Sequence, residues 1–239
     1  MRSSLAHPGP RTLSDRVDAQ AGPRGLDLSL PVSIRVEVRR TSRLWAWGQR
    51  MIAVLACIAL IPTFLVLYLP VRITSRGSFL FAQKRPGYRG RPLTVIKIRT
   101  MRAGSEVRTA LGTSRRSPEI TRIGSMLRDL KLDELPQLFN VARGEMELVG
   151  PRPIPTALDQ ELRRHIPGFE LRYQVKPGLT NVSQVTVLDN KLGDRLIADW
   201  KLRFEGELHY IKNKSFAYDL VVLAMTAAFV GRKLFARRG

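Results

Sequence analysis

Two adjacent carboxylates, Asp133 and Glu134, are the residues best suited to chemistry in this chain, because they stand in a sequence that is otherwise strongly basic. Pro136 follows them, and proline is tolerated only in the first turn of a helix or at a kink. We therefore expect the pair at or near a helix N-terminus. There the helix dipole and the free N–H groups favour an ionised carboxylate and bind phosphate oxygens.

The two acids suit different tasks at a phosphate site. An ionised aspartate can attack phosphorus as a nucleophile. The next residue of a helix points about 100° away around the axis, so Glu134 could help to hold a metal or orient a group. One or two carboxylates together with substrate phosphates suit Mg²⁺. An adjacent acidic pair alone is usually a solvated helix face, but in this context Asp133 and Glu134 are candidate catalytic residues and candidate ligands of Mg²⁺.

An arginine follows the acids in the loop at residues 150–153, Gly-Pro-Arg-Pro. Arg152 stands between two prolines, which restrict its backbone. A guanidinium fork presented in this way suits a diphosphate. Taken singly, most basic residues are solvated surface charges. Those that we predict to bind substrate phosphates together with Arg152 are Lys97, Arg99, Arg128 and Arg85.

Charge and composition narrow the class of partner. The chain has 239 residues, with 40 Lys and Arg against 20 Asp and Glu, and a formal net charge of +20. Such an excess of base implies anionic partners, which include phosphorylated substrates, acidic lipid and nucleic acid. We expect that nucleic acid is not a partner. In the basic segment at 72–102, Tyr88 is the only aromatic residue of the turn, and a platform on which bases stack needs several. One cysteine, Cys57, excludes a disulfide framework.

Residues 51–71 carry no charge and would form a helix roughly 30 Å long, the thickness of a bilayer core. Pro62 lies at the centre, where it removes a backbone hydrogen bond and predicts a kink. Arg50 and Arg72 flank the run, and the positive-inside rule disfavours moving either flank across the membrane. A spanning helix and a kinked helix that enters and leaves by the same face both remain open, and the kink and the symmetric charge favour the second.

The rest of the chain predicts a small mixed fold. Residues 72–102 hold nine Lys or Arg and no acid, so this block should lie against anionic lipid headgroups. Within it, β-type residues flank a turn and predict a hairpin. Apolar periodicity predicts further helices, and the last could be a core helix or an amphipathic interfacial one. The expected strands are 79–83, 93–98 and 182–187, the expected helices 120–130, 156–165, 196–212 and 217–230, and the expected polar loop 103–119.

These elements define a fold class and four segments. We expect an α+β, mainly helical protein, with a kinked re-entrant membrane helix, a catalytic domain that contains the hairpin, and amphipathic interfacial helices. Residues 1–42 are rich in Pro, Gly, Ser and Arg and predict a disordered basic tail. The membrane helix would take 43–72 and the catalytic domain 73–220. A C-terminal amphipathic helix and basic tail would take 221–239.

Six short segments, in this order, resemble those of the bacterial sugar transferase family, the monotopic phosphoglycosyl transferases. They are QKRPG at 83–87, KIRTM at 97–101, ITRIG at 120–124, LDELPQL at 132–138, LVGPRP at 148–153 and PGLT at 177–180. Each segment alone is weak, but the ordered set is very specific. The resemblance covers about residues 50–220.

The resemblance implies a reaction. Members of this family transfer a sugar phosphate from a nucleoside-diphosphate sugar, typically a UDP-sugar, to polyprenyl (undecaprenyl) phosphate, which starts the synthesis of a cell-surface glycan or exopolysaccharide. It implies that Asp133 is the nucleophile that carries a covalent phosphosugar and that Glu134 completes the dyad. Arg152 would be the family's Pro-Arg-Pro arginine, and Mg²⁺ the cofactor. A kinked re-entrant helix would hold the catalytic domain on the cytoplasmic face of the bacterial inner membrane.

Some residues depart from the family pattern. Where members carry Lys-Arg and then Asp at the start of the membrane helix, this chain has Gln49-Arg50-Met51. Such departures leave one rival, a catalytically inactive membrane scaffold or regulator with the same fold. Because no further spanning segments precede residue 51, we expect the small form of the family. The sequence leaves the sugar undetermined and a homo-oligomer open.

Overall fold

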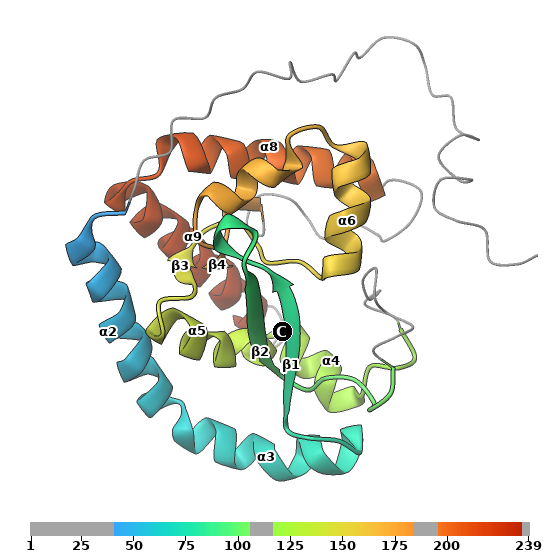
Figure 1. Cartoon of the computed structure of the whole chain (residues 1–239). Helices are drawn as coiled ribbons and strands as arrows, with labels where there is room; N and C mark the ends of the chain where they lie inside the picture. The colour runs from blue at the N-terminus through green and yellow to red at the C-terminus, as the bar shows by residue number, and fades with distance from the viewer. Residues whose placement is uncertain (1–40, 106–116, 184–195, 236–239) are drawn as a thin grey trace, which may run out of the picture.

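The computed structural model describes residues 41–105, 117–183 and 196–235, and it is mainly helical with two small sheets, as the α+β expectation requires (Figure 1). The expected tail up to residue 40, the loop at 106–116, the strand from residue 184 onward and the last four residues lie outside the described residues. Val182 and Ser183 are helical rather than extended. The elements are α2 (Arg43–Ala59), α3 (Ile61–Ser75), β1 (Leu80–Pro86), η1 (Tyr88–Gly90), β2 (Pro92–Ile98), α4 (Arg122–Asp129), η3 (Leu132–Gln137), α5 (Leu138–Ala142), β3 (Glu147–Val149), α6 (Thr156–His165), η4 (Phe169–Gln174), β4 (Gly178–Thr180), α8 (Leu196–Asn213) and α9 (Phe216–Phe235).

The expected hairpin is confirmed and lies at the centre of the fold (Figure 1). Strands β1 and β2 pair antiparallel, with Lys97 opposite Phe81. Alternate residues of β2 face inward, and Val95 is 1% exposed, because successive side chains of a strand point to opposite faces. At its far end Ile98 joins Val71 of α3 and Leu127 of α4 in a small separate core. The hairpin thereby links the bent helices to the first helix of the catalytic part.

The main core is built by the helices that the periodicity predicted. Helix α6 has the expected bounds, and α8, expected at 196–212, buries Phe204, Leu208 and Ile211. Phe169 of η4 packs its ring 5.1 Å from that of Phe204. Each such buried side chain stabilises the fold by about 1.5–3 kcal/mol. This core supports the end of β3, from which the Gly-Pro-Arg-Pro loop begins.

The sequence did not predict β3 and β4, which form a parallel pair with Glu147 opposite Gly178 and Val149 opposite Thr180. The two strands approach very closely at their glycines. A Cβ on Gly178 would lie 2.0 Å from the backbone nitrogen of Gly150, a separation that no real side chain shows. Glycine at residue 178 is therefore required for this pairing.

Helices α2 and α3 form a bent arm along one side of the molecule, with α2 beside α5 and α3 beside α4 (Figure 1). The bend is 57°, and Pro62 stands in the first turn of α3, next to the expected kink. Among the described residues no single helix is long and apolar enough to cross a membrane, whereas this bent pair meets the length and composition test together. Its outward side chains are apolar, for example Leu65 and Val66.

Polar contacts dock α2 onto the rest of the protein. Gln49 is buried, and its Oε1 accepts a hydrogen bond of 2.7 Å from the backbone N–H of Leu148 in β3. Near the start of α2, Trp45 Nε1 donates to Asp219 of α9 at 2.8 Å, and Tyr210 donates to the same carboxylate at 2.7 Å. The uncharged Gln49, which departs from the family pattern, is thus a docking residue. Helix α9 begins at Phe216, so the boundary expected at residue 220 falls inside one helix.

Candidate active site

The two acids lie in the first turn of η3, as their sequence predicted, but this helix is a short 3₁₀ helix rather than an α-helix. Lys131 precedes it with a left-handed backbone (φ 60°) and gives no side-chain cap. Pro136 sits inside the same short helix. Asp133 and Glu134 are each only 7% exposed, so two neighbouring carboxyl groups are brought together out of water.

Glu134 is held by two cations from distant parts of the chain. Its Oε1 accepts from Lys97 Nζ at 2.9 Å and from Arg152 Nη2 at 2.5 Å, and its Oε2 accepts from Arg152 Nη1 at 3.1 Å. Burial alone would raise the pKa of Glu134, but Arg152, then Lys97 and Lys131, hold that pKa well below its usual range. A two-pronged, charge-assisted contact of this kind fixes geometry as well as charge. Glu134 is therefore an ionised anchor.

Asp133 has the opposite environment. Burial and the charge of Glu134 raise its pKa above the usual aspartate value, although Lys97, Arg128 and Lys131 act in the other direction. Its Oδ1 is buried without a hydrogen-bond partner among the described residues. A buried acceptor left unpaired costs about 1–3 kcal/mol. Such an oxygen is destabilised until a cation or an electrophile reaches it, which is the environment that a nucleophile needs.

Three of the basic residues expected to act with Arg152 approach this dyad. Lys97 lies on β2, and burial lowers its pKa to about 8. The charge of Arg128, on α4, acts on Asp133. Burial and then the charge of Arg152 lower the pKa of Arg85 to about 10. The structure thus brings three of the four expected cations to the dyad along with Arg152.

The fourth expected cation, Arg99, is placed differently. Its Nε donates to the backbone carbonyl of Ser78 at 3.0 Å, and its guanidinium lies 5.3 Å from the centre of the Phe81 ring. These contacts put it at the connection between α3 and β1. Its role in binding phosphate stays a prediction.

A close backbone contact positions Arg128. Thr121 caps α4 by accepting from the N–H of Gly124 at 2.9 Å. A Cβ on Gly124 would lie 2.0 Å from the carbonyl oxygen of Thr100, so only glycine lets α4 approach the chain after β2 this closely. Thr100 Oγ1 then accepts from Arg128 Nε at 2.8 Å. This packing places the ITRIG segment against the KIRTM segment.

The backbone of the Gly-Pro-Arg-Pro loop is held by residues from β1, β4, η4 and α8. The N–H of Gly150 donates to Thr180 at 3.1 Å, and that of Gly178 donates to the carbonyl of Pro151 at 3.0 Å. Arg85 Nη1 donates to the carbonyl of Pro153 at 2.5 Å. The remaining contacts come from Arg172 and Glu207, which hold the peptide groups of Arg152.

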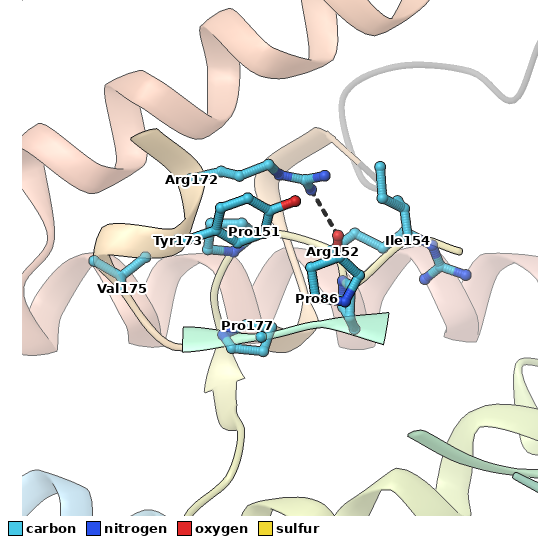
Figure 2. Close-up of a pocket in the computed structure, with 10 residues that line it drawn as sticks. Pro86, Pro151, Arg152, Ile154, Arg172, Tyr173, Val175 and Pro177 are labelled. Carbon is cyan, nitrogen blue, oxygen red and sulfur yellow. Dashed lines mark hydrogen bonds between the residues drawn. The ribbon is translucent and has the colours of Figure 1, made fainter. Parts of the chain in front are cut away.

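Sequence reasoning missed Arg172 and Glu207. Each is an ordinary charge in an amphipathic stretch, so no local signal marked either of them. Figure 2 shows the guanidinium of Arg172 directed at the carbonyl oxygen of Arg152, beside a small pocket. The pocket is lined by Pro86, Gly87, Pro151, Arg152, Pro153, Ile154, Arg172, Tyr173, Val175 and Pro177.

The Mg²⁺ ion that the sequence predicts would need ligands from the substrate as well as from the protein. Nowhere in residues 41–105, 117–183 and 196–235 do three His, Cys, Asp or Glu side chains gather closely enough to hold a metal by themselves. The unpaired Oδ1 of Asp133 suits a hard cation. Both oxygens of Glu134 already accept from cations, so its role as a metal ligand stays a prediction.

Comparison with known proteins identifies relatives along most of the chain. A family profile described as bacterial sugar transferase matches residues 43–233. The UDP-glucose:undecaprenyl-phosphate glucose-1-phosphate transferase of Caulobacter vibrioides is 38% identical over 165 residues, which are 69% of this chain and 61% of that protein. The undecaprenyl-phosphate glucose phosphotransferase of Komagataeibacter xylinus is 36% identical over 216 residues, 87% of this chain and 40% of that protein.

A third relative is similar in length. The exopolysaccharide production protein ExoY of Sinorhizobium fredii is 34% identical over 191 residues, which are 74% of this chain and 80% of that protein. The chain therefore spans less than two thirds of the first two relatives and most of the third.

Proposed function

Because the chain belongs to the bacterial sugar transferase family, we propose that it transfers a sugar phosphate from a nucleoside-diphosphate sugar to polyprenyl phosphate through a phosphosugar held covalently on Asp133. The buried, unpaired Oδ1 of Asp133 among several cations carries this proposal. The names of both of the first two relatives support undecaprenyl phosphate as the acceptor. The name of the Caulobacter protein also supports UDP-glucose as the donor.

The reaction has two displacements. In the first, a carboxylate oxygen of Asp133 attacks the phosphorus bonded to the sugar, and the bond from that phosphorus to the bridging oxygen breaks. The nucleoside monophosphate leaves with the electron pair. In the second, an oxygen of the polyprenyl phosphate attacks the same phosphorus. The bond to Asp133 breaks, its carboxylate is restored, and polyprenyl diphosphate sugar is released, so no net proton transfer is needed.

The neighbouring residues support these steps through charge. Lys97 and Arg152 are fixed by Glu134, and the charge of Lys97 also acts on Asp133. These cations therefore need not reorganise as charge develops on phosphorus. Glu134 prevents those cations from pairing with Asp133, whose Oδ1 stays available. When bound, Mg²⁺ would neutralise charge on the diphosphate. Asp133 and the substrate phosphates would hold it.

The acceptor is a lipid, and the bent arm offers a place for the protein to meet it. We propose that α2 and α3 enter and leave the cytoplasmic face of the inner membrane on the same side. The 57° bend and the exposed apolar side chains of both helices support this. Phe216 and Leu220 of α9 are also exposed and would rest in the interface, with anionic headgroups against the basic segment at 72–102.

Nucleotide release tests the reaction. The purified protein is incubated with Mg²⁺, undecaprenyl phosphate and a panel of UDP-sugars that begins with UDP-glucose, and release of UMP is measured. We expect release that requires Asp133, and intact-mass analysis should find a phosphosugar adduct that Asp133→Asn lacks. Full activity of Asp133→Asn would exclude the covalent mechanism. A wild-type protein that forms neither UMP nor adduct with any donor would favour the inactive scaffold.

A further inference from the structure

The peptide groups of Arg152 are held at both ends by one buried ion pair. Glu207 Oε1 accepts from the backbone N–H of Arg152 at 3.1 Å, and Arg172 Nη2 donates to the carbonyl of Arg152 at 2.6 Å. We propose that Arg172 and Glu207 are positioning residues that hold Arg152 in the orientation in which its guanidinium binds both carboxylate oxygens of Glu134. This inference rests on the transfer reaction proposed above.

The pair is built as a rigid unit. Arg172 Nη2 lies 3.0 Å from Glu207 Oε1, and both side chains are only 2% exposed. The guanidinium of Arg172 lies 4.7 Å from the centre of the Phe169 ring and 5.8 Å from that of Trp200, a stacking geometry that fixes its plane. The position of this rigid ion pair therefore determines the position of the loop.

The Pro-Arg-Pro part of the loop, residues 151–153, has a single backbone donor. Proline has no backbone N–H, so within residues 151–153 only Arg152 can donate a main-chain hydrogen bond. Glu207 accepts that bond. The carbonyls on either side are held by Gly178 and Arg85, which leaves the Arg152 peptide to be oriented by Glu207 and Arg172.

The orientation matters because both terminal nitrogens of the planar Arg152 guanidinium bind Glu134. Arg152 Nη1 and Nη2 reach separate oxygens of Glu134, at 3.1 and 2.5 Å. Rotation of the peptide would displace the guanidinium at the end of its long side chain. A misplacement of about 1 Å in an active site can cost about a hundredfold in rate.

A double-mutant cycle tests the inference. Glu207→Gln keeps the size of the side chain and removes the charge that holds Arg172. We expect it to slow UMP release about tenfold to a hundredfold. Arg152→Met should slow release more, and adding Glu207→Gln to it should change the rate by less than about twofold, because Glu207 acts through Arg152. Rate losses that multiply in the double variant would overturn the proposal.

A matched control separates positioning from stability. Glu147→Gln makes the same chemical change in another buried ion pair, that of Glu147 with Lys214 at 2.5 Å. Glu147→Gln should lower Tm about as much as Glu207→Gln does. If it slows UMP release, the double variant with Arg152→Met should show the product of the two single rate losses.

A structure of the Glu207→Gln protein gives a result that needs no activity. We expect the Arg152 guanidinium to leave Glu134 while the fold stays intact. If it remains within hydrogen-bond distance, the proposal is wrong even if the protein is a transferase. If the wild-type protein releases no UMP but the guanidinium moves as expected, the proposed function fails and the positioning role stands.

Discussion

The rate of the proposed transfer should fall at high pH, where the ammonium group of Lys97 loses its proton. Its Nζ lies 2.9 Å from Glu134 Oε1, and the side chain is 16% exposed. Burial lowers the pKa of Lys97 to about 8; the charge of Glu134 opposes this shift, whereas those of Arg85 and Arg152 add to it. An ordinary lysine, with a pKa of about 10.4, would keep its proton well above pH 9.

The size of the effect follows from the pKa. The cationic form is the active one in the proposed mechanism, so activity is lost as pH rises. With a pKa of about 8, roughly nine tenths of Lys97 is charged at pH 7 and roughly one tenth at pH 9. Because kcat/KM reports the ionisation of the free enzyme, it should fall about tenfold between these two values.

Substitution of the lysine separates this effect from others. Lys97→Arg keeps a positive charge at every pH in this range, so its kcat/KM should start lower but stay flat up to pH 9. Lys84→Arg, at an exposed position of the neighbouring strand, should keep the wild-type profile. The assay is UMP release at fixed Mg²⁺ and saturating undecaprenyl phosphate, with folding checked by circular dichroism at each pH. A tenfold fall in Lys97→Arg as well would refute the assignment.

Three further results are expected. Gly178→Ala would place a Cβ 2.0 Å from the backbone nitrogen of Gly150, which follows the facing strand. In a denaturant titration it should lower the free energy of unfolding by about 1–3 kcal/mol, and it should abolish UMP release. Gly206→Ala, where the added Cβ makes only an ordinary contact, should have neither effect. Arg152→Lys replaces a fork by a single ammonium, so UMP release should fall about tenfold to a hundredfold, as expected for losing a hydrogen bond to the charged Glu134; wild-type rates would contradict the two-pronged contact. Burial and the charge of Glu134 raise the pKa of Asp133, so ¹³C NMR of the metal-free protein should find this carboxyl titrating above the usual aspartate value of about 3.9; a midpoint at or below that value would count against the buried nucleophile.

Local pattern was enough for much of the fold. The hairpin and helix α6 were predicted from alternation, turn residues and helical periodicity, which are properties of neighbouring residues. The parallel pairing of β3 with β4 was missed. Each strand has only three residues, and α6 and η4 lie between them in the sequence, so nothing near either strand shows that the other exists.

The sequence by itself determined the family, because ordered segments such as LDELPQL and LVGPRP are specific as a set. It also predicted Asp133 and Glu134 as the dyad. It could not decide how Asp133 and Glu134 differ. Tertiary structure brings Lys97 and Arg152 onto Glu134 and leaves Oδ1 of Asp133 buried and unpaired. The pKa of a carboxyl group depends on burial and on charges within a few ångströms, and here those charges come from strands and loops far away along the chain.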